Sequence, residues 1–332
     1  MSDLKMKQLL ATEPVTSISN PASELAACRV AIFLCTYNGA EFLVEQLDSF
    51  VRQTHQNWVI YASDDGSSDA TLSILQRYQK MLGAERLVIL EGPRQGFAKN
   101  FMSLVKNPTI SADYYAFSDQ DDLWFVDRLE RGLANLLATP ATTPALFCSR
   151  TRLIDGSGQV IGFSPLFARQ PGFRNALVQS LAGANTMLLN AAARDLLAKT
   201  PGDAHIVSHD WLTYLLVSGC GGKVIYDPSP TLDYRQHGTN LIGANSSFAD
   251  RLVRIRKMFA GTFREWNRHN LYALNSHYKQ LTADSRKAFE CFEQARESSL
   301  LRRMYLLRRA GVYRQTLLGN IGLVVAASIG RI

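Results

Sequence analysis

Hydrophobic and polar positions along residues 29–122 switch repeatedly between two periods. Short runs rich in β-branched and aromatic residues indicate strands, and each is followed by a stretch in which apolar residues recur at helical spacing. The expected strands are Val30–Leu34, Trp58–Ala62, Arg86–Leu90 and Tyr114–Phe117. The expected helices between them cover 41–52, 69–80 and 98–106. This alternation predicts an α/β domain with a mostly parallel sheet flanked by helices.

Each of three expected strands leads into a loop of small, polar or acidic residues. These loops are Cys35–Gly39, Ser63–Ser67 and Asp119–Asp122. Because parallel strands all end on the same side, the loops are expected to meet at one edge of the sheet. That edge is where open α/β sheets bind ligands.

The order of elements changes after residue 124. A helix is expected over 126–138, followed by strands at Ala145–Ser149 and Thr186–Leu189, a helix over 211–217 and a strand at Lys223–Tyr226. Beyond about residue 248 the pattern is helical only. The expected organisation is therefore a flexible N-terminal extension over 1–28, the α/β domain over 29–247, and a helical region over 248–332.

Composition supports a folded core in a reducing compartment. The 332 residues are 46% apolar, which is enough for one large domain with an appendage. Five cysteines are scattered without a CxxC pair, which favours neither a disulfide framework nor a thiolate metal site. Residues 1–28 lack the apolar core of a secretory signal. A cytoplasmic protein is expected.

The net charge of +7 is unevenly distributed. Residues 251–332 hold 16 Lys and Arg against 5 Asp and Glu, whereas residues 1–250 hold 20 against 24. Segments 251–259 and 301–309 set basic residues against apolar ones, which predicts basic amphipathic helices on an anionic membrane surface. We expect these helices to lie on the membrane and not to cross it, because the run 321–329 is too short to span a bilayer. The residues expected to insert are Tyr305, Leu306, Leu307 and the run 321–329.

Two alternatives remain for these helices. They could pack on the α/β domain or on a partner protein, or their charge could bind nucleic acid. No nucleic-acid-binding motif accompanies the charge, so nucleic acid is not an expected partner.

Three carboxylates crowd into the loop after the fourth expected strand, at Asp119, Asp121 and Asp122. Like charges this close are costly unless a cation or a donor-rich ligand neutralises them. Mg²⁺ or Mn²⁺ with a nucleotide diphosphate would do so, because both ions prefer oxygen ligands and bind through few carboxylates plus phosphate. The alternative is that the acids cap the following helix.

Six segments in order resemble inverting family 2 glycosyltransferases of the GT-A fold, in the rhamnosyltransferase-like branch. They lie within residues 29–243. The segments are Thr36-Tyr37-Asn38-Gly39, Asp64-Asp65-Gly66-Ser67-Ser68-Asp69, Gly96-Phe97-Ala98-Lys99-Asn100, Ser118-Asp119-Gln120-Asp121-Asp122-Leu123-Trp124, His209-Asp210-Trp211 and Tyr234-Arg235-Gln236-His237-Gly238-Thr239-Asn240.

The resemblance implies a nucleotide site in the first two segments. Thr36, Tyr37 and Asn38 would face the base and ribose, although Asn-Gly also suits an ordinary turn. Asp65 would accept the imino N–H of uracil or thymine. Asp64 or Asp69 would support the loop, and for Asp69 helix capping is preferred.

The resemblance also implies a metal and phosphate site. Asp119-x-Asp121 corresponds to the DxD signature, with Asp121 on the metal, Asp119 on ribose or a metal-bound water, and Asp122 at the edge. His237 would return to the metal or diphosphate, and Arg235 would pair with phosphate oxygens. Without the family context, a loop histidine and a surface ion pair are the alternatives for these two residues.

Asp210 corresponds to the family's catalytic base, which removes the acceptor proton during an inverting displacement. Its alternative is the N-cap of the helix at Trp211. Gly183, Asn185 and Trp211 are expected at the donor and acceptor pocket. The branch often carries Cys or another small residue where this chain has Asn185.

The expected function is a metal-dependent inverting glycosyltransferase that moves L-rhamnose from dTDP-rhamnose to a lipid-linked saccharide during O-antigen or other surface polysaccharide assembly. The enzyme would work at the inner face of the cytoplasmic membrane. A UDP-sugar donor is the alternative within the family. A nucleotidyltransferase would need a Gly-rich, Arg-containing loop after the first strand, which Cys35–Gly39 is not. A catalytically inactive sugar-binding or membrane scaffold protein is the alternative from another class.

Overall fold

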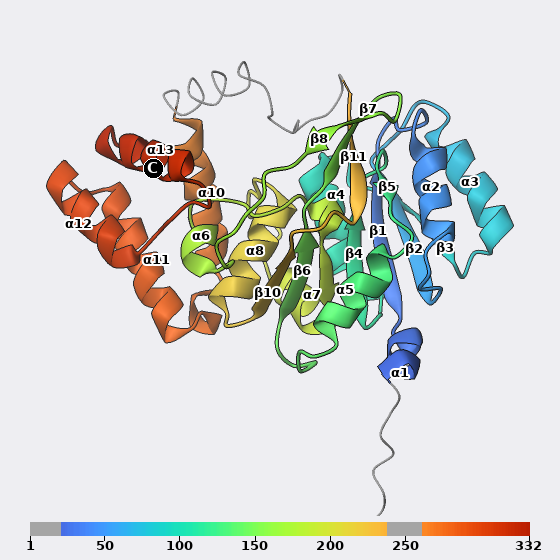
Figure 1. The fold of residues 1–332 in the computed structure, drawn as a ribbon, viewed down its shortest axis with the longest axis horizontal. Coiled ribbons are helices and arrows are strands. Elements are labelled where there is room, and N and C mark those ends of the chain that lie inside the picture. Colours follow the sequence, from blue (N-terminus) through green and yellow to red (C-terminus); the bar gives the residue numbers. More distant parts are fainter. Residues whose placement is uncertain (1–20, 238–260) are drawn as a thin grey trace, which may run out of the picture.

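The computed structural model describes residues 21–237 and 261–332 (Figure 1). Predictions for residues 1–20, for Gly238-Thr239-Asn240 and for the basic segment 251–259 lie outside the described residues. Within the described part, helices surround a central sheet, and the C-terminal helices α10–α13 gather at one end of the molecule (Figure 1).

A seven-stranded sheet forms the centre of the molecule, in the order β10-β6-β9-β4-β1-β2-β3. Only β9 runs antiparallel to its neighbours, so the predicted mostly parallel sheet is confirmed. In chain order, the strands are β1 (Val30–Thr36), β2 (Trp58–Asp64), β3 (Leu87–Glu91), β4 (Tyr114–Ser118), β6 (Ala145–Ser149), β9 (Leu188–Asn190) and β10 (Lys223–Asp227).

Alternate side chains of β1 face two different helix layers. Val30, Ile32 and Leu34 pack toward α2, α3 and α5, and Ala31 and Phe33 pack toward α4, α7 and α8, as the two-residue period of a strand requires. The helices of the α/β part are α1 (Pro21–Ala27), α2 (Leu43–Val51), α3 (Thr71–Leu82), α4 (Phe97–Lys106), α5 (Arg128–Leu136), α6 (Phe173–Ala176), η1 (Ala184–Thr186), α7 (Ala191–Ala198) and α8 (His209–Gly219).

The C-terminal helices share a hydrophobic core with the sheet. Helix α10 contacts α8, and α11 contacts α6. Leu306 and Leu307 are buried in this core, so the expectation that they enter a membrane is wrong, whereas Tyr305 is exposed. Packing against the α/β part is thus confirmed for residues 261–332. These elements are α10 (Thr262–Asn275), η2 (Tyr278–Gln280), α11 (Ala283–Arg296), α12 (Leu300–Ala310) and α13 (Leu317–Ser328).

A second sheet, not expected from the sequence, lies beside the first in the order β5-β11-β7-β8. Its strands are β5 (Leu123–Trp124), β7 (Arg152–Asp155), β8 (Val160–Phe163) and β11 (Leu232–Gln236). Strand β11 pairs antiparallel with β5 and parallel with β7. The short β5 follows the acidic loop directly, so this pairing places His237, the residue after β11, beside that loop.

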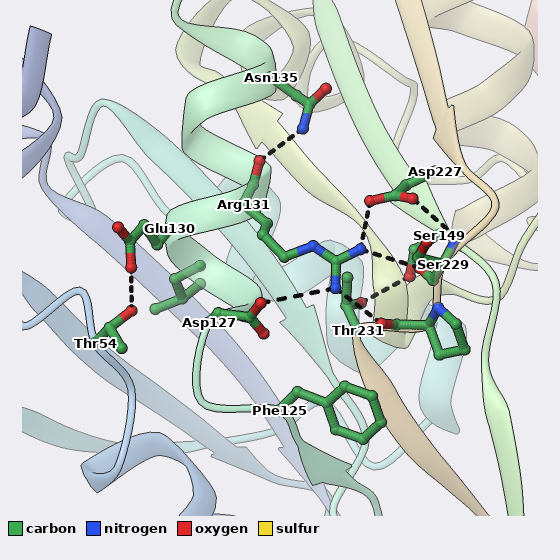
Figure 2. A network of polar contacts seen from close by, with 12 residues as sticks. Thr54, Phe125, Asp127, Glu130, Arg131, Asn135, Ser149, Asp227, Ser229 and Thr231 are labelled. Atoms are coloured by element: carbon green, nitrogen blue, oxygen red, sulfur yellow. Dashed lines mark hydrogen bonds and ion pairs between the residues drawn. The ribbon is translucent and has the colours of Figure 1, made fainter.

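Arg131 of α5 fixes where β11 begins (Figure 2). Its guanidinium donates to Asp227 Oδ2 at 2.6 Å and to the carbonyl oxygen of Pro230 at 2.9 Å, while Thr231 Oγ1 lies 2.7 Å from Ser149 Oγ. These contacts hold the turn between β10 and β11 against α5. The residues that lead into β11 are thereby positioned by hydrogen bonds from α5 and β6.

Candidate active site

The first two loops at the carboxyl edge of the sheet are joined through Asp64. Its Oδ1 accepts from Thr36 Oγ1 at 2.8 Å, and its Oδ2 accepts from the backbone N–H of Ser67 at 2.8 Å. The backbone N–H of Asp65 donates to the carbonyl oxygen of Thr36 at 2.8 Å. Thr36 is therefore a buried support of the loop, and Asp64 has the supporting role given as one of its options.

Asn38 and Tyr37 lie at the tip of the first loop. Asn38 has a φ of 46°, in the left-handed region that Asn tolerates, and its Oδ1 accepts from the N–H of Ser68 at 2.8 Å. Its own N–H donates to Ser67 Oγ at 2.9 Å. These bonds fix the turn, and the ring of Tyr37 is left exposed at the sheet edge.

Asp65 and Asp69 both accept backbone N–H groups. The two oxygens of Asp65 accept from Arg94 at 2.6 Å and from Gly96 at 2.8 Å, which ties its loop to the start of α4. Asp69 Oδ1 accepts from the N–H of Thr71, the first residue of α3, at 3.0 Å. Burial alone would raise the pKa of Asp69, but the hydrogen bonds from Thr71 and Ala40 hold it below its usual value. Ala70 occupies the N-cap position of α3, so Asp69 supports the start of this helix from the residue before the cap. Base recognition by Asp65 stays a prediction.

Gln120 clamps the first loop to the acidic loop. Its Oε1 accepts from the N–H of Tyr37 at 2.9 Å, and its Nε2 donates to the carbonyl oxygen of Tyr37 at 3.1 Å. The expected meeting of the three loops at one edge is thus confirmed. Sequence reasoning gave Gln120 no role, although its place between two acids was the available signal.

Asp119 lies among like charges. Burial, with Asp121 and Asp210 nearby, raises the pKa of Asp119 to about 7. The carboxylates of Asp121 and Asp210, which come from two separate motifs, are therefore close enough in the fold to raise the pKa of Asp119. Helix α5 begins only at Arg128, with Asp127 at its N-cap position, so the alternative that the acids 119–122 cap the next helix is wrong.

Asp121 and His237 are brought together by the second sheet. The pairing of Leu232 with Trp124 and of Asp233 with Leu123 runs antiparallel, so the chain after β11 returns to residue 121. His237 Nε2 lies 2.8 Å from Asp121 Oδ2, and its ring lies 4.9 Å from that of Phe42. This pairing of predicted metal residues is what the sequence led us to expect.

Asp121 and His237 offer one oxygen and one nitrogen donor. Across residues 21–237 and 261–332, no group of three or more His, Cys, Asp or Glu is arranged to hold a metal. Mg²⁺ and Mn²⁺ commonly use one or two carboxylates together with substrate phosphates and water, and imidazole is also acceptable to transition metals. The two donors fit such a shared site.

Asp122 is a buried support, not a residue at the edge of the site. Asn185 Nδ2 donates to its Oδ2 at 2.6 Å, and the N–H of Arg235 donates to its Oδ1 at 3.3 Å. Burial, with Asp121 and Asp119, raises its pKa well above the usual value. The pKa of Arg128 falls to about 9 through burial, and the carboxylate of Asp122 opposes that fall.

The guanidinium of Arg235 is buried and directed toward protein acceptors. It donates to Glu45 Oε2 at 2.7 Å, to the carbonyl oxygen of Asp121 at 3.1 Å and to that of Gly156 at 3.1 Å. The backbone that carries Asp121 is therefore held by Arg235. Its predicted contact with a diphosphate stays a prediction, and these bonds favour a positioning role.

Asp210 lies in the first turn of α8. Ser208 occupies the N-cap position, so the alternative that Asp210 is the cap is wrong. Its Oδ1 accepts from the N–H of Trp211 at 2.7 Å, and its Oδ2 accepts from Ser180 Oγ at 3.4 Å. Burial raises the pKa of Asp210, against the opposing effect of hydrogen bonds from Ser208, Trp211 and Ser180.

A cage of aromatic rings fixes the start of α8. His209 stacks on Phe101 with ring centroids 4.0 Å apart, and it meets Phe117 edge-on at 4.8 Å. Burial lowers the pKa of His209 to about 3, so the imidazole is neutral. A neutral ring fits this apolar cage and holds the residue next to Asp210 in place. Sequence reasoning gave His209 no role of its own.

Two of the three residues predicted for the sugar pocket are buried, and the third, Gly183, is exposed. Asn185 is buried against Asp122, and Trp211 is buried with its Nε1–H donating to the carbonyl oxygen of Ala176 at 2.7 Å. Gly183 begins the short helix η1, where its carbonyl oxygen accepts from Thr186 Oγ1 at 2.9 Å. Contact of these residues with a sugar stays a prediction.

Comparisons with known proteins show which family this chain is similar to. Residues 31–181 match the family described as Glycosyl transferase family 2. The chain is 31% identical over 234 residues to dTDP-rhamnosyl transferase RfbG of Shigella flexneri, a match covering 67% of this chain and 78% of that protein.

Two solved structures share the fold. One is a mannosyltransferase from Pyrobaculum calidifontis in complex with GDP-Man and Mn²⁺, with a TM-score of 0.50 and 17% identity over 92% of this chain and 86% of that one. The other is TarS 1-349 of S. aureus in complex with UDP-GlcNAc, with a TM-score of 0.52 and 13% identity over 91% and 90%.

Proposed function

The chain belongs to glycosyltransferase family 2 and has the GT-A fold, and from that premise we propose that it transfers L-rhamnose from dTDP-rhamnose to a lipid-linked saccharide. Its similarity to a dTDP-rhamnosyl transferase supports the donor. A UDP-sugar is the alternative donor, since TarS was solved with UDP-GlcNAc.

The observation that carries the proposal is the gathering of Asp119, Asp121 and Asp210 at one sheet edge, with His237 beside Asp121. Acids drawn from the loop after β4 and from α8 are costly to bring together unless a substrate or a cation neutralises their charge. A donor diphosphate and an acceptor hydroxyl supply that use.

Asp210 is the proposed base. The acceptor oxygen bonds to the anomeric carbon of the sugar from the side opposite the phosphate, while the bond from that carbon to the phosphate oxygen breaks. The acceptor proton passes to the Asp210 carboxylate, and the nucleoside diphosphate leaves with the bonding electron pair. This geometry inverts the configuration at the anomeric carbon.

Asp121 and His237 would hold Mg²⁺ or Mn²⁺. When bound, the cation neutralises negative charge that develops on the leaving diphosphate. Asp119 orients the ribose or a water, Asp65 accepts the imino N–H of the base, and the clamp between Gln120 and Tyr37 keeps the nucleotide loop in register with the acids.

The acceptor is proposed to be an intermediate of O-antigen or another surface polysaccharide, held at the inner face of the cytoplasmic membrane. All five cysteines are free thiols, which supports a reducing compartment. Within residues 21–237 and 261–332, no helix has both the length and the apolar character needed to cross a bilayer. We therefore propose a peripheral association.

Hydrolysis of a panel of nucleotide sugars in the absence of acceptor tests the donor. We expect dTDP-rhamnose to be turned over faster than UDP-sugars, and turnover to need Mg²⁺ or Mn²⁺. Faster turnover of a UDP-sugar would replace the donor, and full turnover in excess chelator would overturn the metal role of Asp121 and His237.

A further inference from the structure

Helix α13 (Leu317–Ser328) is apolar around its whole circumference. Its sequence, LLGNIGLVVAAS, contains no charged residue. Such a helix is normally covered on all sides, in a protein core or in lipid. One side of α13 meets this expectation, because Leu323, Ala326 and Ala327 are buried in the core shared with the sheet.

The other side of α13 carries large apolar side chains in contact with solvent. Leu317 is 78% exposed, Leu318 72%, Ile321 52%, Val324 50% and Val325 40%. Their spacing places them in one row along the helix, because residues three, four and seven apart share a face. We call these five residues the α13 outer row. Contiguous apolar surface of this kind marks a site of interaction.

The helix next to α13 carries exposed arginines. Helix α12 packs against α13, and Arg303 of α12 donates to the carbonyl oxygen of Ala327 at 2.8 Å. Arg302, Arg308 and Arg309 of α12 are exposed. Residues 299–332 contain six arginines and no Asp or Glu, so this segment is basic, whereas the neighbouring helix α11 carries Asp284, Glu290 and Glu293.

An exposed apolar row beside a helix with exposed arginines matches the surface of an anionic bilayer. Apolar side chains enter the boundary between headgroups and acyl chains, and arginines meet the phosphates of the lipids. We propose that the α13 outer row, with Arg302, Arg308 and Arg309, is the face by which this protein docks on an anionic membrane. This face keeps Ile321, Val324 and Val325 from the run 321–329 that was expected to insert, and it leaves out Leu306 and Leu307, which are buried.

Helix α13 and the carboxyl end of β1 both lie toward the same side of the molecule. In Figure 1, β1 begins at the bottom of the view beside α1, so its carboxyl end lies toward the top, and α13 lies at the upper left. A bilayer that contacts α13 would therefore present a lipid-linked acceptor from the side of Asp210. Presentation of the acceptor in this way rests on the proposed function, whereas the docking face itself does not.

Sedimentation of the full-length protein with vesicles tests the face directly. The probes are vesicles of phosphatidylglycerol with phosphatidylethanolamine and vesicles of phosphatidylcholine alone. We expect binding to the first and little to the second. The double change Leu318→Glu with Ile321→Glu should lower the partition coefficient by at least roughly tenfold at both low and high salt, because the apolar contribution is not screened.

Exchanging the arginines separates charge from apolar insertion. The triple change Arg302→Gln, Arg308→Gln and Arg309→Gln should lower binding on the order of a hundredfold at low salt, since each basic residue near an anionic surface contributes roughly fivefold. At high salt the triple variant and the wild type should converge. An unchanged salt dependence would overturn the role of the arginines.

Met81→Glu is the matched control, because Met81 is 62% exposed on α3, on the opposite side of the molecule in Figure 1. It should bind vesicles like the wild type. Equal loss in the control and in the α13 variant would overturn the proposal, as would an α13 variant that still binds. Conversion of a wild-type dimer to a monomer by the α13 changes, with vesicle binding intact, would assign the face to a second copy of the chain instead.

Donor hydrolysis without acceptor distinguishes failure of this proposal from failure of the proposed function. The α13 variant should hydrolyse the donor at the wild-type rate, because the outer row lies outside the candidate site. With acceptor embedded in anionic vesicles its KM should rise, and with a water-soluble acceptor it should match the wild type. If the wild type did not hydrolyse the donor, the proposed enzyme chemistry would be overturned, but the result on membrane docking would stand.

Discussion

The nucleotide-side loops and the acidic centre are both built on aspartates, but the two regions treat their carboxylates in opposite ways. Asp64 and Asp69 accept several N–H and O–H groups supplied by the chain itself. Asp119 and Asp210 instead have raised pKa values, through burial and, for Asp119, through neighbouring acids. The raised pKa values make Asp119 and Asp210 candidates for contact with a substrate or a cation, whereas Asp122, whose pKa is also raised, is held as a support by Asn185 and Arg235.

The largest effect should come from Asp121→Asn, which removes charge from the centre. We expect turnover of the nucleotide sugar to fall roughly 10³-fold or more, because stabilisation of the leaving diphosphate is lost. Calorimetry should show weaker metal-dependent binding of dTDP or UDP. Asp127→Asn, an equal change of charge six residues away, should leave both quantities near the wild-type value. Unchanged metal-dependent binding in Asp121→Asn would contradict the assignment.

Asp210→Asn should separate binding from chemistry within the centre. Transfer should fall by roughly 10²-fold, the usual scale for loss of a general base, with donor affinity near that of the wild type. Single-turnover transfer and nucleotide titration measure the two quantities. Transfer at the wild-type rate in this variant would point to a different carboxylate.

Asp64→Ala should mainly affect stability, in contrast to the two changes above. The substitution leaves the buried Thr36 hydroxyl and loop N–H groups without their acceptor, so the free energy of unfolding should fall by roughly 3 kcal/mol. Asp69→Ala, which removes a more exposed helix-start acceptor, should cost about 1 kcal/mol. Thermal unfolding measures both. A larger loss for Asp69 than for Asp64 would break the assignment of Asp64 as the main loop support.

The smallest expected effect is a pH dependence from Asp210. A carboxyl group with a raised pKa stays protonated to higher pH, and only its ionised form accepts a proton. Transfer should therefore rise with pH through a pKa above the ordinary aspartate value of about 3.9, and fall about tenfold for each pH unit below it. Asp69→Asn should leave this acid limb in place. An acid limb at or below the ordinary value would remove Asp210 from the role of base.

The sequence predicts the parallel half of the fold well, because local pattern determines it. The expected strands Val30–Leu34 and Trp58–Ala62 appear as Val30–Thr36 and Trp58–Asp64, each extended into its loop. The second sheet escapes prediction, because β5 contains only Leu123 and Trp124 and exists through pairing with a strand more than a hundred residues later. No local pattern encodes such a partner.

The candidate site likewise has features that the sequence predicts and features that it does not. Motif order brings Asp119, Asp121, Asp210 and His237 together, and the fold agrees with that grouping. The burial of Asp122 and Arg235 was not predictable, because it depends on Asn185 and Glu45, which reach them from distant segments. The family resemblance implied an edge position for Asp122 and a contact with phosphate oxygens for Arg235.

The clamp between Gln120 and Tyr37 has a consequence for how this chain can evolve. A Cβ added at Gly39 would collide with the side-chain amide of Gln120, so the glutamine occupies the space that a larger residue at position 39 would need. Substitutions at positions 39 and 120 should therefore be epistatic, each harmful alone and tolerated together when Gln120 is replaced by a smaller residue. A library that varies both positions should recover such coupled pairs, and the accessible mutational path should pass first through position 120.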